Sequence, residues 1–262
     1  MYKWNAEDYE KNSSWQQKLA TELIATIDLK GNERILDIGC GDGKVTAEIA
    51  RNVPNGAVLG IDKSEEMIDY AQSKFPSSNY PNLSFQYGDA SQLNFENELD
   101  LVVSFSCLHW IIDHIPVLAG IKRSLKPGGR TILQFGGKGN ASTLIGIANK
   151  AIAQGRWTNY FQDFSLPYGF YGDDEYKEWL NQVGLKPTSV KLIPQTMLQK
   201  GKEGLIGWIR TTWLPLTSRI PEELQQEFIE DLANTYVESH PPDSDGFVCV
   251  PMTRLKVEAT KV

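Results

Sequence analysis

The fold of this chain is decided by the stretch Ile35-Leu36-Asp37-Ile38-Gly39-Cys40-Gly41-Asp42-Gly43. Its apolar start is typical of a buried strand, and glycines then follow at alternate positions. Residues 44–51 read as the first turns of a helix. A strand, a tight glycine turn and a helix N-terminus bring bare backbone close to a ligand, so the stretch predicts a nucleoside-binding turn.

Two acids set this turn apart from a dinucleotide-binding turn. Asp37 lies at the end of the predicted strand, and Asp42 lies within the turn. A dinucleotide site presents backbone amides to a pyrophosphate, which two carboxylates would repel. The same carboxylates suit a ligand that carries a sulfonium and an ammonium group. The turn therefore predicts S-adenosylmethionine as the cofactor.

Two further acids end the next predicted strands. Asp62 follows the strand over 57–61, where a carboxylate can accept hydrogen bonds from both ribose hydroxyls. NAD sites share this feature, so Asp62 alone does not discriminate between the two cofactors. Asp89 follows the strand over 83–87 and is placed to accept a hydrogen bond from the adenine amino group. Three acids at successive strand ends favour a binding site over solvated turn residues.

Strands and helices alternate along the chain with short connections. The patterns predict helices over 14–28, 44–51, 116–125 and 175–183, with another from Ser64, and strands over 35–38, 57–61, 83–87, 99–105, 130–135, 188–193 and 253–262. This alternation predicts the α/β class, with a doubly wound, Rossmann-like sheet of seven mostly parallel strands and a helical cap formed by insertions. Ligands bind such sheets at the carboxyl ends of the strands.

The chain is expected to divide into segments with different roles in this fold. The core of the cofactor site is expected over 31–136, because the alternation breaks at the glycine-rich stretch 136–139. The other segments are an N-terminal helical lid over 1–30, a first cap segment over 137–172, a core helix and strand over 173–198, a second cap segment over 199–243 and a final strand over 244–262.

Composition narrows the function classes. A formal net charge of -7 with no basic run argues against a nucleic-acid partner. No apolar stretch approaches the ~20 residues of a membrane helix, and the N-terminus lacks the apolar core of a signal peptide. The three cysteines have no paired spacing, so we expect reduced thiols in a cytoplasmic protein, and no metal site is expected from the three histidines. The oligomeric state stays open.

Several motifs taken together resemble the class I S-adenosylmethionine-dependent methyltransferases. They are Leu36-Asp37-Ile38-Gly39-Cys40-Gly41, Gly60-Ile61-Asp62 with Ser64 and Met67-Ile68, Gly88-Asp89 and Leu108-His109-Trp110. More narrowly, the chain resembles the trans-aconitate methyltransferase group, which is similar to the juvenile-hormone acid methyltransferases. The resemblance implies small carboxylic acids as acceptors, with methyl esters as products.

The resemblance also implies roles for individual residues. It implies that Trp4, Tyr9 and the helix from Ser13 close over the cofactor, and that Gln16 lies near the methyl group and the acceptor. The cofactor-binding set that we expect on the core is Asp37, Gly39, Cys40, Gly41, Asp62, Lys63, Met67, Asp89, Ala90 and Ser106.

The segment after the fourth predicted strand is expected to face the methyl acceptor. His109 is the candidate catalytic residue, because an imidazole can position or deprotonate an acceptor; packing beside the cofactor is the equal alternative. Trp110 is expected to line the pocket, and Cys107 has no base that would make it a nucleophile. The many aromatic residues over 156–171 fit an acceptor of mainly apolar character.

One departure from the aconitate group bears on the acceptor. Those enzymes have an arginine directly before the proline that corresponds to Pro215, whereas Leu214 precedes it here. Arg210 and Arg219 lie nearby in sequence and are possible substitutes. The departure favours a monoacid or an apolar natural product over a tricarboxylate.

The expected function is methylation of a small carboxylic acid. Two alternatives stay open at this point: O-, N- or C-methylation of an apolar natural product, and a non-catalytic module that binds S-adenosylmethionine. A nicotinamide-dependent oxidoreductase is the rival outside this class. It would need its third glycine one position beyond Gly43 and a catalytic pair that the sequence does not offer.

Overall fold

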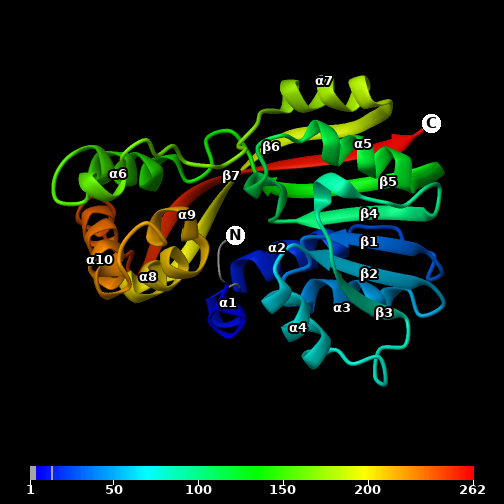
Figure 1. Cartoon of the computed structure of the whole chain (residues 1–262), viewed down its shortest axis with the longest axis horizontal. Helices are drawn as coiled ribbons and strands as arrows, with labels where there is room; N and C mark the ends of the chain where they lie inside the picture. Colours follow the sequence, from blue (N-terminus) through cyan, green and yellow to red (C-terminus); the bar gives the residue numbers. More distant parts are fainter. Residues whose placement is uncertain (1–3, 13) are drawn as a thin grey trace. The chain divides into compact units, whose positions relative to one another are not determined.

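The computed structural model describes residues 4–12 and 14–262, and its centre is a seven-stranded sheet with the order β3-β2-β1-β4-β5-β7-β6 (Figure 1). The strands β1 to β5 pair in parallel, and β7 runs antiparallel to β5. The predicted α/β class with a doubly wound, mostly parallel sheet is confirmed. The strand bounds are Arg34–Ile38 for β1, Ala57–Asp62 for β2, Leu83–Tyr87 for β3, Leu99–Phe105 for β4, Leu125–Gly136 for β5, Leu185–Lys200 for β6 and Phe247–Lys261 for β7.

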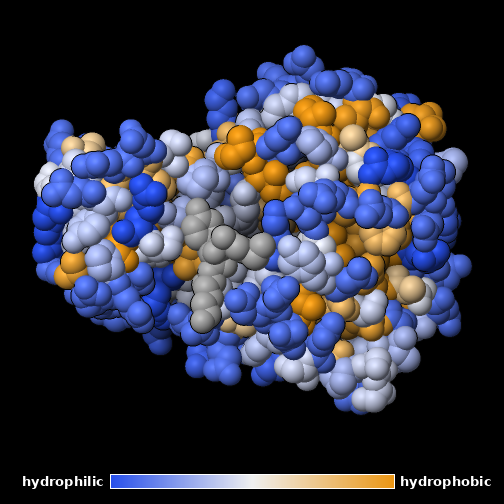
Figure 2. Space-filling view, viewed as in Figure 1, coloured by the Kyte–Doolittle hydropathy of each residue, from blue (hydrophilic) through white to orange (hydrophobic). Residues whose placement is uncertain are grey.

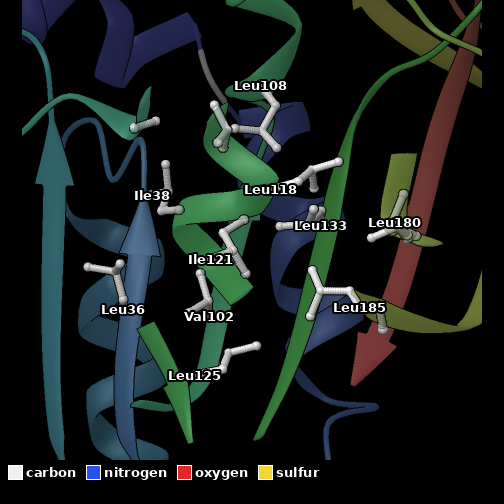
Figure 3. Close-up of a cluster of buried hydrophobic side chains, with 14 of the residues drawn as sticks. Leu36, Ile38, Val102, Leu108, Leu118, Ile121, Leu125, Leu133, Leu180 and Leu185 are labelled. Carbon is white, nitrogen blue, oxygen red and sulfur yellow. The ribbon is translucent and has the colours of Figure 1, made fainter. Parts of the chain in front are cut away.

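Helices cover both faces of the sheet because alternate residues of the central strands are apolar on both sides. Leu36 and Ile38 of β1 pack with α5 (Ile115–Ser124) and α7 (Asp173–Val183) in the cluster drawn in Figure 3. Ile35, one position earlier, packs on the opposite face with α2 (Ser14–Ile24), α3 (Lys44–Asn52) and α4 (Glu65–Lys74). This arrangement leaves the ends of the strands as the part of the sheet that helices do not cover.

The strand order places a topological switch point beside β1. The chain builds outward from β1 to β2 and β3, then returns to add β4 on the other side of β1. The connections that leave β1 and β4 therefore diverge at their carboxyl ends. In open α/β sheets this divergence is where ligands bind, and both the glycine turn and the segment after β4 begin there.

The chain forms two compact units. The first, which we call the sheet unit, comprises Gln16–Lys138, Tyr168–Ile193 and Arg254–Val262. The second, the helical unit, comprises Met1–Trp15, Gly139–Pro167 and Pro194–Thr253. The strands β6 and β7 each continue from one unit into the other. The predicted role of the insertions as a cap over the sheet edge stays a prediction.

The helical unit has a hydrophobic core of its own. Its helices are α1 (Ala6–Asn12), α6 (Ser142–Ala153), α8 (Gly201–Thr212), α9 (Leu214–Thr217) and α10 (Glu222–Ser239). Buried aromatic residues dominate the core, and the ring centroids of Trp157 and Phe228 lie 5.2 Å apart in an edge-to-face arrangement. The indole N–H of Trp157 donates to Asp231 at 2.9 Å. Many aromatic residues of the insertions are therefore core residues of this unit.

Three elements differ from the sequence prediction. The helix predicted over 14–28 ends at Ile24, and β7 begins at Phe247 instead of residue 253. The alternation of buried residues in β7 already starts at Val248, and exposed Pro251 interrupts the apolar pattern without ending the strand. The strand predicted over 130–135 begins earlier, at Leu125, as β5, and its pairing with β4 shifts register between Leu99 and Leu101.

The surface is mostly hydrophilic in the view of Figure 2, with apolar residues between the polar ones over the sheet unit. Within the described ranges 4–12 and 14–262, no helix is both long enough and apolar enough to cross a bilayer.

A buried hydrogen bond between His114 and Tyr176 connects the start of α5 with α7. His114 precedes α5, and its Nε2 lies 2.8 Å from the carbonyl oxygen of Ile111, so Nε2 carries the proton. Burial lowers the pKa of His114, which keeps the ring neutral at pH 8. Its Nδ1 therefore accepts a hydrogen bond from the hydroxyl of Tyr176, a fully buried residue of α7.

Substitution Tyr176→Phe is expected to lower the free energy of unfolding by about 1–3 kcal/mol, because it leaves the Nδ1 of His114 buried without its donor. The matched control is Tyr171→Phe, whose hydroxyl donates to the carbonyl oxygen of Ile112 at the surface. Water can replace that bond, so the expected loss is below about 0.5 kcal/mol. Urea unfolding at pH 8 measures both, and equal losses would contradict the assignment of the buried pair.

Candidate functional site

The glycine turn after β1 is fixed by backbone contacts on both sides. The N–H groups of Gly39 and Cys40 donate to the carbonyl oxygen of Ile61 in β2, at 2.8 and 3.0 Å. The φ angles of Gly39, Gly41 and Gly43 are 75°, 53° and 81°, a region that side chains disfavour. A Cβ atom on Gly39 would also lie 2.2 Å from the sulfur of Cys107. The turn therefore needs glycine for both its conformation and its packing.

Asp37 lies buried beneath this turn, with 2% of its surface exposed. The hydroxyl of Thr46 in α3 donates to its Oδ2 at 2.7 Å. Burial, with a smaller contribution from the charge of Asp62, raises the pKa of Asp37 to about 7. Burial disfavours the ionised form of Asp37, and a nearby positive charge would stabilise that form.

Asp42 is the second acid of the turn, and it is also buried. Its carboxylate forms an ion pair with Lys44, with 3.2 Å between Oδ2 and Nζ, and its Oδ1 accepts the N–H of Lys44 at 3.3 Å. This carboxylate therefore has a cationic partner within the fold, whereas the described partner of Asp37 is a neutral hydroxyl.

Asp62 joins the glycine turn to the start of α4. Its Oδ2 accepts the N–H of Gly41 at 3.0 Å, and its Oδ1 accepts the N–H of Ser64 at 2.9 Å. Burial raises the pKa of Asp62 despite these bonds. Each carboxylate oxygen keeps acceptor capacity beyond one hydrogen bond, so the pair of oxygens can also receive two hydroxyl groups.

Asp89 and Lys63 form an ion pair at the ends of β3 and β2, with 2.5 Å between Oδ2 and Nζ. The Oδ1 of Asp89 accepts the N–H of Ser91 at 2.9 Å and so caps the short helix η1 (Ala90–Gln92). Burial acts to raise the pKa of Asp89, but the hydrogen bonds from Lys63 and Ser91 outweigh it and lower the pKa. Asp89 is therefore ionised at neutral pH, and Lys63 is one of its partners.

Three other predicted cofactor residues contribute packing. Met67 and Ala90 are buried, Met67 in α4 and Ala90 at the start of η1. Cys40 packs in the core between α3 and α4, and a Cβ atom on Gly60 would lie 2.9 Å from its Cβ. Burial raises the pKa of the thiols of Cys40 and Cys107. Both thiols are therefore protonated at neutral pH.

The segment after β4 brings Ser106 and His109 to the same edge of the sheet. Ser106 has a φ of 56°, which is unusual for a residue with a side chain, and its N–H donates to the carbonyl oxygen of Gln134 at 2.7 Å. Its Oγ accepts a hydrogen bond from Nη2 of Arg254 in β7 at 2.6 Å. Non-glycine residues in this conformation persist where their surroundings hold them, and they cluster at functional sites.

His109 lies in the short helix η2 (Leu108–Trp110) among aromatic rings of the sheet unit. Its ring stacks on Phe170 with 5.8 Å between centroids, and Trp110 and Tyr168 lie beside it. Burial, with a smaller contribution from the positive charge of Arg254, holds the pKa of His109 well below its ordinary value. Its Nδ1 accepts the N–H of Gly136 at 3.5 Å, so the proton of the neutral ring lies on Nε2.

The other predicted site residues belong to the helical unit or have side chains outside the described part of the chain. Trp4 and Tyr9 belong to the helical unit and pack edge to face, with 5.5 Å between centroids. Gln16 belongs to α2, and its side chain lies outside the described part of the chain. Arg210 is bound to Asp8 by two hydrogen bonds of 2.8 Å, and Arg219 donates to the carbonyl oxygens of Tyr160 and Gln162. Both candidate substitutes for the missing arginine are thus engaged within the helical unit.

The sequence reasoning missed Arg254. The pattern that could have indicated this residue is the alternation of buried positions in β7. Val248, Val250 and Met252 are buried, and Arg254 continues the same series. An arginine on the buried side of a strand is rare without a polar partner. The partner is Ser106, which lies far away in sequence and becomes visible only when β7 and β4 are placed in one sheet.

The donor set at this edge fits S-adenosylmethionine. The raised pKa of Asp37 marks a place where a positive charge is stabilising, and the sulfonium and ammonium groups supply one. Asp62 can accept ribose hydroxyls. A pyrophosphate would meet the buried carboxylates of Asp37 and Asp42 at the glycine turn and would be repelled by them.

Comparison with known proteins agrees with this chemistry. A family described as "Methyltransferase domain" matches residues 35–129, which include Asp37, Asp62 and Asp89. Protein 235L of Invertebrate iridescent virus 6, which is provisionally named a methyltransferase, is 32% identical over 89% of this chain and 85% of its own. A trans-aconitate 2-methyltransferase of Methylobacterium nodulans is 27% identical over 100% of this chain and 99% of its own.

A solved structure shares the fold. Phosphoethanolamine N-methyltransferase 2 of Haemonchus contortus, in complex with phosphomonomethylethanolamine and S-adenosylhomocysteine, superposes with a TM-score of 0.62 at 19% identity, over 98% of this chain and 56% of that chain. The glycine turn, the acids at the strand ends and the relationship to the viral protein lead to one conclusion: the chain belongs to the S-adenosylmethionine-dependent methyltransferases.

Proposed function

We propose that this methyltransferase methylates the carboxylate of a small, mainly apolar acid and produces a methyl ester. The observation that carries the proposal is the state of His109, which is neutral, with its proton on Nε2 and its Nδ1 taken by Gly136. In this tautomer Nε2 presents a hydrogen-bond donor, and Nδ1, the nitrogen that could accept a proton, already accepts the N–H of Gly136, which argues against a general base. An ionised carboxylate needs no base, whereas an alcohol or phenol does.

The relationship to the aconitate enzymes supports an acid as acceptor. The relative from Methylobacterium nodulans is named for methylation of trans-aconitate and matches this chain along its full length. The acceptor that we propose differs from a tricarboxylate because Arg210 and Arg219 are engaged by Asp8 and by backbone carbonyl groups. The rings of Phe170, Tyr168 and Trp110 around His109 support an apolar body for the acid.

The cofactor site that we propose uses the residues at the ends of β1, β2 and β3. Asp62 would accept the ribose hydroxyls, and Asp37 would stabilise the positive charge of the methionine part. Backbone of Gly39, Cys40 and Gly41 would approach the ligand closely, with Met67 and Ala90 beside the adenine. Asp89, Lys63 and Ser106 complete the set on the core. Trp4, Tyr9 and Gln16 remain predictions from the resemblance.

The protein itself forms no covalent bond in this reaction. S-adenosylmethionine supplies a methyl group on a positively charged sulfur, which is a good leaving group. The chain has to hold the acceptor oxygen in line with that group and keep water away. Fixing two reactants in this way lowers a barrier by ~7–11 kcal/mol. The fixed glycine turn and the aromatic rings beside His109 are built for holding and exclusion.

The proposal predicts the chemical nature of the product. The protein is incubated with radiolabelled S-adenosylmethionine and separate pools of acceptors: polycarboxylates including trans-aconitate, monoacids including decanoate and farnesoate, and phenols. We expect label in the monoacid pool that mild base releases as methanol, because esters hydrolyse under these conditions and methyl ethers do not. Base-stable label would indicate O-, N- or C-methylation and would contradict ester formation. Binding of S-adenosylhomocysteine without turnover of any pool would favour the non-catalytic module.

The hydrogen bond that occupies Nδ1 of His109 predicts a small effect of replacing this residue. We expect His109→Ala to lower kcat for the best acid by only about two- to fivefold, because a packing contact and one hydrogen bond are lost but no proton transfer is. The control is His240→Ala, which removes a histidine of the helical unit from the end of α10. Single-turnover rates measure the effect at pH 7.5. A loss of ~10²-fold or more for His109→Ala would favour general-base chemistry.

A further inference from the structure

An open cavity of about 700 Å³ begins at the amino ends of β4 and β5, away from the ligand edge of the sheet, and extends along α5. Lys261, the last residue of β7, lines it and donates to the carbonyl oxygen of Leu125, the first residue of β5, at 2.7 Å. All its lining residues belong to the sheet unit. A cavity of this volume is large enough for a small organic molecule.

The charged side chains of this cavity are mainly basic. Lys122, Arg123 and Lys261 line it together with one acid, Glu96. The whole chain has the opposite balance, with 26 basic and 33 acidic side chains and a formal net charge of -7. The excess of cations is therefore a local feature of the cavity, and it favours an anionic ligand.

Two of these cations act on each other. Lys261 donates to the Oδ1 of Asn97 and to the carbonyl oxygen of Leu125, both at 2.7 Å, and both acceptors are neutral. Burial, together with the positive charge of Lys122, lowers the pKa of Lys261, and the charge of Glu96 opposes this more weakly. An anion that contacts both ammonium groups would relieve their repulsion.

The carbonyl groups at the end of α5 already have donors. The carbonyl oxygen of Arg123 accepts the N–H of Asn97 at 3.0 Å. That of Ser124 accepts the N–H of Glu98 at 2.9 Å. The last carbonyl groups of a helix are the ones that would otherwise attract basic side chains. The ammonium group of Lys122 is therefore not needed to cap this helix and can serve a ligand.

The rest of the cavity is partly apolar. Ile115 and Ala119 lie one turn apart on α5, and Lys122 follows on the same side of the helix. Val183, the last residue of α7, adds another apolar side chain. A Cβ atom on Gly184 would lie 3.7 Å from Cε of Lys122, so the stem of this lysine runs past the end of α7. The cavity thus has a basic end and an apolar part.

We propose that this cavity binds a small phosphate monoester with an apolar body. Lys122 and Lys261 contact its phosphate group, and the side of α5 that carries Ile115 and Ala119 contacts its body. A phosphate monoester suits the site because it carries up to two charges for two ammonium groups, and its oxygen atoms accept several hydrogen bonds. The site lies away from the cofactor edge, and the inference does not depend on the proposed ester chemistry.

Hexyl phosphate is the probe for this site. It is titrated into the protein saturated with S-adenosylhomocysteine, and the amide signals are followed by ¹H–¹⁵N NMR. We expect the amides of Ala119 and Val183 to shift with one dissociation constant and those of Gly39 and Gly41 to stay unchanged. Hexanol and inorganic phosphate should each bind at least about tenfold more weakly, because each lacks one part of the interaction. Heptanoate has a single charge and should also bind more weakly.

Matched variants separate this site from general attraction to a charged surface. Lys122→Met and Lys261→Met should each raise the dissociation constant of hexyl phosphate about tenfold, because each removes a hydrogen bond between charged groups. Lys122→Arg keeps the charge and should stay within about threefold of the wild type. The control Lys126→Met removes a cation of β5 that pairs with Asp100 at 2.7 Å and should change the constant by less than about twofold.

Each alternative result would overturn the inference. Shifts confined to the amides of Gly39 and Gly41 would assign the probe to the cofactor edge. Equal losses for Lys126→Met and Lys122→Met would indicate attraction to surface charge without a defined site. Binding of hexanol or inorganic phosphate as tight as that of hexyl phosphate would contradict a site that uses both charge and apolar contact. Heptanoate binding as tightly as hexyl phosphate would contradict the choice of a phosphate group.

Discussion

The geometry of the cofactor edge depends on the turn between β1 and α3, where three glycines allow the backbone to adopt positive φ angles and lie close to its neighbours. Two amides of the turn bind the carbonyl oxygen of Ile61, and a third binds the carboxylate of Asp62, so β2 holds the turn at its own carboxyl end. Since a Cβ atom on Gly39 would collide with Cys107, the segment after β4 also fits against the turn. The cofactor edge and the acceptor edge are therefore parts of one packing arrangement at the switch point of the sheet.

Charge is distributed unevenly along this edge. Asp37, Asp62 and Asp89 end β1, β2 and β3, whereas Arg254 lies on β7 at the other side of β4 and β5. The acidic side suits the cationic cofactor. Neutral His109 and its aromatic neighbours lie in the part of the edge that follows β4. The order of the strands thus places the three acids and Arg254 on opposite sides of β4 and β5.

Local sequence patterns predict the first half of this arrangement well. The glycine turn, Asp62 and Asp89 each follow directly from an apolar strand, so short-range spacing is enough to place them. Arg254 and the strained backbone of Ser106 depend on pairing between segments more than 100 residues apart in sequence, which no local pattern records. Local patterns also do not record which charged side chains pair. The ion pair of Lys63 with Asp89 and the bonds of Arg210 to Asp8 therefore did not follow from the sequence.

The central claim is that a buried acid beneath the turn makes this edge a site for a cation. It is tested most directly by carboxyl ¹³C NMR titration of Asp37, assigned with the Asp37→Asn variant, in the protein alone and with S-adenosylhomocysteine. The account predicts a pKa of about 7 in the free protein. The pKa should fall in the complex, because the ammonium group favours the ionised form, and affinity should therefore rise with pH through 7. An ordinary pKa near 3.8 in the free protein, or no change on binding, would contradict the account.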